Sequence, residues 1–93
     1  MAIRSFADAR TEAVFRGERP GRWGNIIDVA RRKLDMLDAA ENLADLRSPP
    51  GNRLERLVGD RAGQYSIRVN VQWRICFRWT ASGPEDVEIV DYH

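Results

Sequence analysis

Residues 64–79 read QYSIRVNVQWRICFRW, and they contain two runs of alternating side chains. In 64–69 the apolar residues come at every second position, and in 73–79 large apolar residues alternate with arginine and cysteine. Because successive side chains of a β-strand point to opposite faces, this period of two predicts two strands, each with one apolar face. The positions expected to face a core are Tyr65, Ile67, Val69, Trp73, Ile75, Phe77 and Trp79.

Two further strands are expected on either side of this pair. LERLV at 54–58 alternates, and GDRAG at 59–63 carries a glycine at both ends, which favours a tight turn. TASGPED at 80–86 is a second turn, and VEIV at 87–90 is the last predicted strand. Strands joined by such short connections form an antiparallel sheet with one face on the core and one face free.

The first half of the chain predicts two helices. A short helix is expected at 8–17, with Asp8 as its N-cap and Gly17 as its C-cap. A longer amphipathic helix is expected at 25–43, where apolar residues recur at helical spacing. The side of this helix that would face the sheet carries Ile27, Ala30, Leu34 and Leu37.

Length and composition favour one domain of the α+β class, residues 1–93, with a further short strand at 1–6. No apolar run approaches a membrane span and the first ten residues lack a signal sequence, so a cytoplasmic location is expected. One cysteine and one histidine make no zinc cluster, and no carboxylates are spaced for magnesium, so neither metal nor cofactor is expected. Cys76 is expected to be a small buried hydrophobe.

The net charge of +1 conceals an uneven distribution. Residues 47–80 contain seven arginines and two acidic residues, whereas 81–93 contain four acidic residues and neither lysine nor arginine. Arginine's planar fork of donors matches phosphate, so the middle segment favours an anionic partner. Arg68, Arg74 and Arg78 would share the free face of the sheet, where like charges repel unless an anion offsets them. Pairing with strand acids such as Glu88 is the structural alternative.

The only histidine, His93, ends the chain after Asp91 and Tyr92. Imidazole suits proton transfer near neutral pH, whereas a frayed terminus is the plain alternative. Strict alternation would place Asp91 and His93 on one side of the last strand and Tyr92 on the other. We expect instead that the chain leaves the ladder after Val90, so that both rings turn toward Arg74.

The stretch GDRAGQYSIRVNVQWRICFRW, followed by VEIVDYH at the end of the chain, resembles HigB, the plasmid-maintenance toxin family within the RelE/ParE superfamily. The resemblance runs from IRSF to the C-terminus. It implies two N-terminal helices on a curved antiparallel sheet, and ribosome-dependent cleavage of messenger RNA in the A site. It also implies a helix-turn-helix antitoxin, HigA, that neutralises the toxin and represses the shared operon.

The resemblance assigns site residues as well. A histidine that the family contributes from its first sheet strand falls on Glu55, and a nearby lysine falls on Val58. Glu55 could serve as a carboxylate base or only as a neighbour of Arg53 and Arg56. The other positions that match the family are the basic turn at Arg61, the strand arginine Arg74, and the terminal Asp91, Tyr92 and His93.

Cleavage of RNA by attack of its own 2′-hydroxyl needs a base, an acid for the departing 5′-oxygen, and a cation for the charge on phosphate. The imidazole, phenol, carboxylate and guanidinium of the implied site supply these groups, and Tyr92 could also stack on a base. The arginines expected to bind RNA or the ribosome are Arg53, Arg56, Arg61, Arg68 and Arg78.

Two other functions remain open. The missing sheet histidine would suit a degraded toxin that keeps only antitoxin binding and a part in operon regulation. A gyrase-directed toxin of the ParE type would share the fold but not the terminal DYH.

Overall fold

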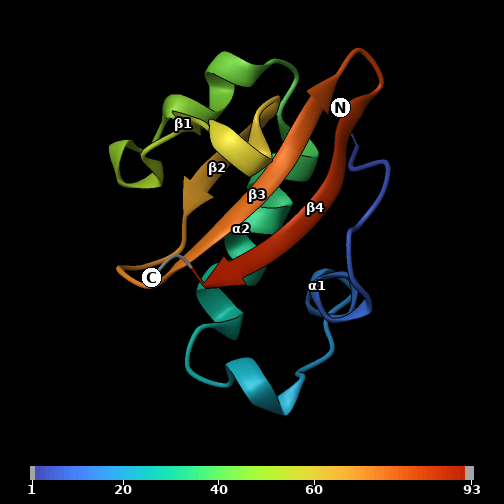
Figure 1. Ribbon diagram of the computed structural model, residues 1–93. Coiled ribbons are helices and arrows are strands. Elements are labelled where there is room, and N and C mark those ends of the chain that lie inside the picture. The colour runs from blue at the N-terminus through green and yellow to red at the C-terminus, as the bar shows by residue number, and fades with distance from the viewer. Residues whose placement is uncertain (1, 92–93) are drawn as a thin grey trace.

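The computed structural model describes residues 2–91, and only the backbone of Arg22. Two helices precede a four-stranded antiparallel sheet in the order β1-β2-β3-β4 (Figure 1). The α+β class with two N-terminal helices is therefore confirmed. Among the described residues no helix is long and apolar enough to cross a bilayer. The elements are α1 (Ala9–Phe15), α2 (Ile27–Ala39), β1 (Glu55–Arg56), β2 (Gln64–Arg68), β3 (Trp73–Thr80) and β4 (Gly83–Asp91).

α1 begins where the sequence predicts, α2 begins at Ile27 rather than at residue 25, and both helices end earlier than predicted. Asp8 caps α1, because its Oδ1 accepts a hydrogen bond from the Thr11 backbone N–H at 2.7 Å. Arg16 follows α1, and Gly17 then adopts a φ of 95°, which glycine tolerates best. α2 ends at Ala39, because residues 42–45 form a capping box that begins a separate 3₁₀ turn, Leu43–Arg47.

The core lies between α2 and one face of the sheet. In Figure 1 α2 lies behind the strands and α1 packs beside β4. The alternation predicted for β2 and β3 is confirmed, since Ile67, Ile75 and Phe77 are fully buried with the apolar side of α2. The α2 residues that are buried are Ile27, Ala30, Leu34 and Leu37.

β4 is longer than the predicted strand at 87–90, because both of its edges have partners. On one edge it pairs with β3, and on the other Phe6 forms an isolated parallel bridge with Val87. This bridge is what remains of the strand predicted at 1–6. Opposite Phe77, β4 carries an extra residue, and Asp86 there has a φ of 53°, a β-bulge that bends the strand.

The second face of the sheet is not free, which corrects the expectation from sequence. Ser66 and Cys76 are fully buried there, and Arg74 is 6% exposed. The segment from residue 53 to residue 61 closes this face: it contains the edge strand β1, and its 3₁₀ turn at 59–61 is the yellow segment in front of the sheet in Figure 1. We call this segment the cover.

Candidate functional site

Arg74 is the fixed positive charge at the centre of the covered face. Its Nε donates to Ser66 Oγ at 2.7 Å, and its Nη2 donates to the carbonyl of Arg53 at 2.6 Å and of Ser66 at 3.3 Å. A guanidinium stays protonated in proteins, so burial leaves its charge in place and these acceptors stabilise it. Arg53 has a φ of 44°, which turns the backbone at the start of the cover, just before β1.

Glu55 is the carboxylate that the structure brings to Arg74. Its Oε1 lies 3.5 Å from Arg74 Nη1, and 54% of its side chain is exposed. The register Glu55↔Ser66 on β1 and β2 puts Glu55 on the same face as Arg74. The accessible carboxylate could take a proton, and the enclosed guanidinium could stabilise a developing negative charge.

The remaining arginines of this face are partly paired with acids. Arg61 of the cover reaches Glu88 of β4 at 3.2 Å and also donates to Gln64 at 3.0 Å. Arg78 lies 3.8 Å from Asp86 with half of its side chain exposed. Arg61 and Arg78 are therefore paired with acidic residues of β4, which is the alternative to an anionic partner that the sequence left open.

Arg68 is different, because its nearest cross-strand neighbour is another arginine. It stands directly opposite Arg74 on β3, and its Nε donates to the Asn70 carbonyl at 3.1 Å. Among residues 2–91 it forms no salt bridge. Two guanidiniums facing each other favour an anion between or beside them.

Arg56 lies on the opposite side of the sheet from this cluster. It pairs with Tyr65, which pairs with Phe77 of the core face. Partners across an antiparallel sheet share a face, so Arg56 is turned away from Arg74. Arg56 and Arg74 thus lie on different faces, and the binding of RNA or the ribosome by Arg56 stays a prediction. Arg53 is exposed, and its backbone carbonyl accepts the hydrogen bond from Arg74 Nη2.

Cys76 is enclosed, as the sequence predicts, although it sits on the covered face. Burial raises the pKa of its thiol above the usual range, and the nearby Arg61 guanidinium offsets this only in part. A thiol held in its neutral form is a poor nucleophile.

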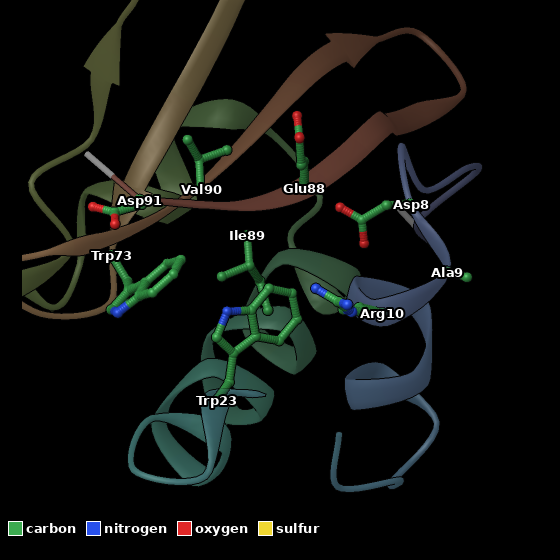
Figure 2. A pocket seen from close by; sticks show the side chains of 9 residues that line it. All are labelled: Asp8, Ala9, Arg10, Trp23, Trp73, Glu88, Ile89, Val90 and Asp91. Carbon is green, nitrogen blue, oxygen red and sulfur yellow. The ribbon is translucent and has the colours of Figure 1, made fainter. Parts of the chain in front are cut away.

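Asp91 remains in the β-ladder, which corrects the expectation that the chain leaves it after Val90. Asp91 pairs with Trp73, whereas Val90 pairs with Arg74, so strand alternation puts the Asp91 and Arg74 side chains on opposite sides. The Asp91 carboxylate accepts from Gln72 Nε2 at 3.1 Å. Figure 2 shows it beside Trp73, with Val90 pointing to the other side. Tyr92 and His93 lie outside the described residues.

A cavity of about 390 Å³ between the last residues of β4 and the start of α1 was not predicted. Trp23 and Trp73 meet edge to face there, with ring centroids 6.0 Å apart (Figure 2). Periodicity could not reveal this contact, because the two residues are fifty positions apart and Trp23 lies in a 3₁₀ turn. The cavity is also lined by Asp8, Ala9, Arg10, Glu88, Ile89, Val90 and Asp91.

Residues 2–91 contain no group of three or more histidine, cysteine or acidic side chains arranged to hold a metal ion. The groups available for chemistry on the covered face are thus the Arg74 guanidinium, the Glu55 carboxylate and the surrounding arginines. Together they make an arginine-rich surface on which Glu55 is the accessible carboxylate next to Arg74.

Comparison with known proteins adds the evolutionary context. The sequence model of HigB-like toxins, described as the RelE-like toxin of the type II toxin–antitoxin system HigB, matches residues 4–93. Over 81 residues the chain is 58% identical to "Toxin HigB-1" of Vibrio cholerae serotype O1, and the alignment covers 85% of this chain and 84% of that protein. It is 29% identical over 92 residues to "Endoribonuclease HigB" of Proteus vulgaris, which covers 98% of this chain and 99% of that protein.

Proposed function

The chain belongs to the HigB family of RelE-like toxins of type II toxin–antitoxin systems, and on this premise we propose that it is an endoribonuclease that arrests growth by cutting messenger RNA on the ribosome. The similarity to a protein named as an endoribonuclease, along 99% of that protein's length, supports RNA as the substrate. The observation that carries the proposal is the pair of Arg74 and Glu55, a fixed cation with an accessible carboxylate 3.5 Å away.

In the proposed reaction a 2′-hydroxyl attacks the adjacent phosphate and the 5′-oxygen of the next nucleotide leaves. Arg74 stabilises the charge that develops on the phosphate oxygens. His93 and Tyr92 exchange protons with the attacking and departing oxygens. Asp91, whose side chain lies on the side of β4 away from Arg74, acts on their orientation from that side. Glu55, at the position of the family's strand histidine, is the alternative acceptor for the 2′-hydroxyl proton.

Binding of the RNA is assigned to the arginines around this pair. Arg68 has no salt-bridge partner among residues 2–91, and Arg78 is half exposed, so both have donors to offer to phosphates. Arg61 can exchange Glu88 for a phosphate, and Arg53 lies at the margin of the same surface. The proposed substrate is therefore ribosome-bound message, held by its backbone.

A toxin of a type II system has an antitoxin partner. We assign this role to a HigA-like helix-turn-helix protein, through which the toxin is linked indirectly to operator DNA. A helix-turn-helix reading frame next to the toxin gene is the expected genetic arrangement.

Primer extension on ribosome-bound message with purified variants tests the proposal. His93→Gln, Tyr92→Phe and Glu55→Gln should each lower the cleavage rate, the first two by about 10²–10⁴-fold, as expected for loss of a positioned proton-transfer group. Cys76→Ser is the matched control and should cut at the wild-type rate. Deleting residues 92–93 should abolish cutting while the thermal midpoint stays within a few degrees.

Three results would contradict the proposal. Wild-type protein that arrests growth and provokes a DNA-damage response without cutting message would be a gyrase-directed toxin. Wild-type protein that binds its antitoxin but cuts no RNA would be the degraded toxin. Efficient cutting of free RNA without ribosomes would retain the nuclease and remove the ribosome dependence.

A further inference from the structure

A groove with a volume of about 490 Å³ lies at the β1 edge of the sheet, on the side away from Arg74. We call it the edge groove. It lies between β1, β2 and the 3₁₀ turn that follows α2, and this volume is in the range of pockets that take several side-chain-sized groups. Its lining is Leu43, Ala44, Arg47, Leu54, Arg56 and Tyr65.

The floor of the edge groove is apolar and firmly supported. Leu43, Leu54 and Tyr65 are each half-buried against the core. The Tyr65 ring stacks on the fully buried Phe77, with centroids 6.2 Å apart and an angle of 28° between the rings. The Tyr65 hydroxyl forms no hydrogen bond within residues 2–91, so a polar donor and acceptor stands on an otherwise apolar floor.

The rim of the edge groove carries two arginines without acidic partners. Arg47 and Arg56 are exposed and form no salt bridge with any described residue. The acids nearest in sequence are engaged elsewhere: Asp45 accepts from two backbone N–H groups, and Glu55 faces Arg74. Two unpaired guanidiniums lining one cavity favour an occupant that carries negative charge.

We propose that the edge groove binds an acidic segment of the antitoxin, in which apolar side chains such as leucine pack on the floor of the groove and flanking carboxylates pair with Arg47 and Arg56. A type II toxin has an antitoxin partner. The apolar floor and the arginine rim of the groove match a peptide with both apolar and acidic side chains. Arginine pairs with carboxylates in a two-bond fork, and an aromatic floor with apolar neighbours suits the anchor residue of a protein interface.

The position of the groove favours a protein over RNA. Arg56 shares the face of Tyr65, whereas the proposed RNA-binding arginines share the face of Ser66 and Arg74. An antitoxin held here leaves the Arg74–Glu55 pair uncovered and would neutralise the toxin by blocking its approach to the ribosome. The proposal rests on the family's need for an antitoxin and not on the nuclease chemistry.

The test measures binding of the purified antitoxin, identified as the product of the neighbouring gene that relieves growth arrest on co-expression. The Arg47→Glu/Arg56→Glu variant should bind it about tenfold or more weakly, since it replaces two interfacial attractions by repulsions. Its thermal midpoint should match that of the wild type, because both side chains are exposed. The control is Arg4→Glu/Arg32→Glu, which changes the net charge equally at two exposed sites outside the groove and should bind within about threefold of the wild type.

Each other outcome overturns the proposal. Unchanged antitoxin affinity in the groove variant would show that the groove is not the docking site. An equal loss of antitoxin affinity in the control variant would show that overall charge, and not the groove, determines binding. Loss of ribosome binding with antitoxin affinity intact would make the groove an RNA-contacting surface. Because affinity is measured without cleavage, a failure of the nuclease proposal leaves this test valid.

Discussion

At the scale of single residues, Arg74 has two tasks at once. Its guanidinium joins β3 to Ser66 of β2 and to the backbone of Arg53, so it fastens the cover to the sheet. The same group is the proposed electrostatic centre of RNA cleavage. A charge enclosed to this degree is stable only with all of its acceptors in place, so its contributions to folding and to activity must be separated by experiment.

Replacing Arg74 by alanine should lower the free energy of unfolding by about 2–4 kcal/mol, because Ser66 Oγ and the Arg53 carbonyl lose a charged donor. Arg68→Ala, on the opposite strand, should cost less than about 1 kcal/mol, since it removes one bond to a backbone carbonyl. Urea unfolding of both variants measures the difference. If Arg74→Ala unfolds at the wild-type urea concentration, the guanidinium does not fasten the cover.

The Cys76 thiol predicts a dependence of stability on pH. Burial raises the pKa of this thiol in the folded state, so above about pH 8.5 the unfolded chain loses the proton first. The stabilisation is complete below that pH and is lost as the pH rises toward the higher folded-state pKa. Burial lowers the pKa of Lys33, so the folded protein loses this proton before the unfolded chain does. Lys33 therefore makes stability rise with pH over part of the same range, opposite to the effect of Cys76.

Subtracting a Cys76→Ala variant isolates the thiol, because Lys33 contributes equally to both proteins. We expect the wild type to lose stability relative to this variant between pH 8 and pH 10, in steps that follow titration of the unfolded thiol. Chemical denaturation at several pH values measures it. A constant difference across this range would mean that the thiol is not desolvated in the folded protein.

At the scale of elements, the outer edge of β4 is closed by the N-terminal segment and by α1. The backbone of residues 4–7 exchanges hydrogen bonds with Pro84 and Val87, and the Ile89 N–H donates to Thr11 Oγ1 at 3.0 Å. Thr11 is fully buried, so its hydroxyl has no water to take over this bond. An edge strand that would otherwise expose unpaired groups is thus protected from pairing with another chain.

Thr11→Val keeps the shape of the side chain and removes the acceptor for Ile89. The orphaned N–H should cost about 1–3 kcal/mol of stability, and hydrogen exchange at Ile89 should accelerate at least as much as global unfolding predicts. Thr11→Ser retains the hydroxyl and should preserve protection of the Ile89 amide. Equal exchange at Ile89 in both variants would show that the hydroxyl does not close this edge.

At the scale of the whole molecule, charge is distributed so that the two sides of the sheet could serve different partners. The net charge is only +1, yet the arginines of residues 47–80 fall into a cluster around Arg74 and a pair at the edge groove. Acidic residues pair with several arginines of the cluster around Arg74, whereas the two arginines at the edge groove have no acidic partner within the described chain. Local fields, rather than net charge, therefore decide what approaches each side.

Ribosome binding should weaken as salt rises, because each phosphate contact releases counterions. The Arg68→Ala/Arg78→Ala variant should reduce the slope of log affinity against log salt by about 1.4–1.8, that is, by two contacts. Arg4→Ala/Arg32→Ala removes the same charge elsewhere and should leave the slope unchanged. Cosedimentation with ribosomes across a potassium chloride series measures both. An unchanged slope in the first variant would remove these arginines from the RNA-binding surface.

The sequence by itself determined the α+β class, the N-cap at Asp8, the buried side of α2 and the core-facing residues of β2 and β3. These features depend on local geometry, because the period of a strand or a helix fixes which side chains share a face whatever lies against it. The family could also be identified from the sequence motif alone.

Only the tertiary structure decided that the second face is covered, that Glu55 meets Arg74, and that Arg56 turns toward a groove with Arg47. It also decided that β4 extends to Asp91, since that length depends on its pairing with β3 and the N-terminal segment. Each of these features joins segments far apart in the chain, where alternation shows which face a residue takes but not what packs on that face.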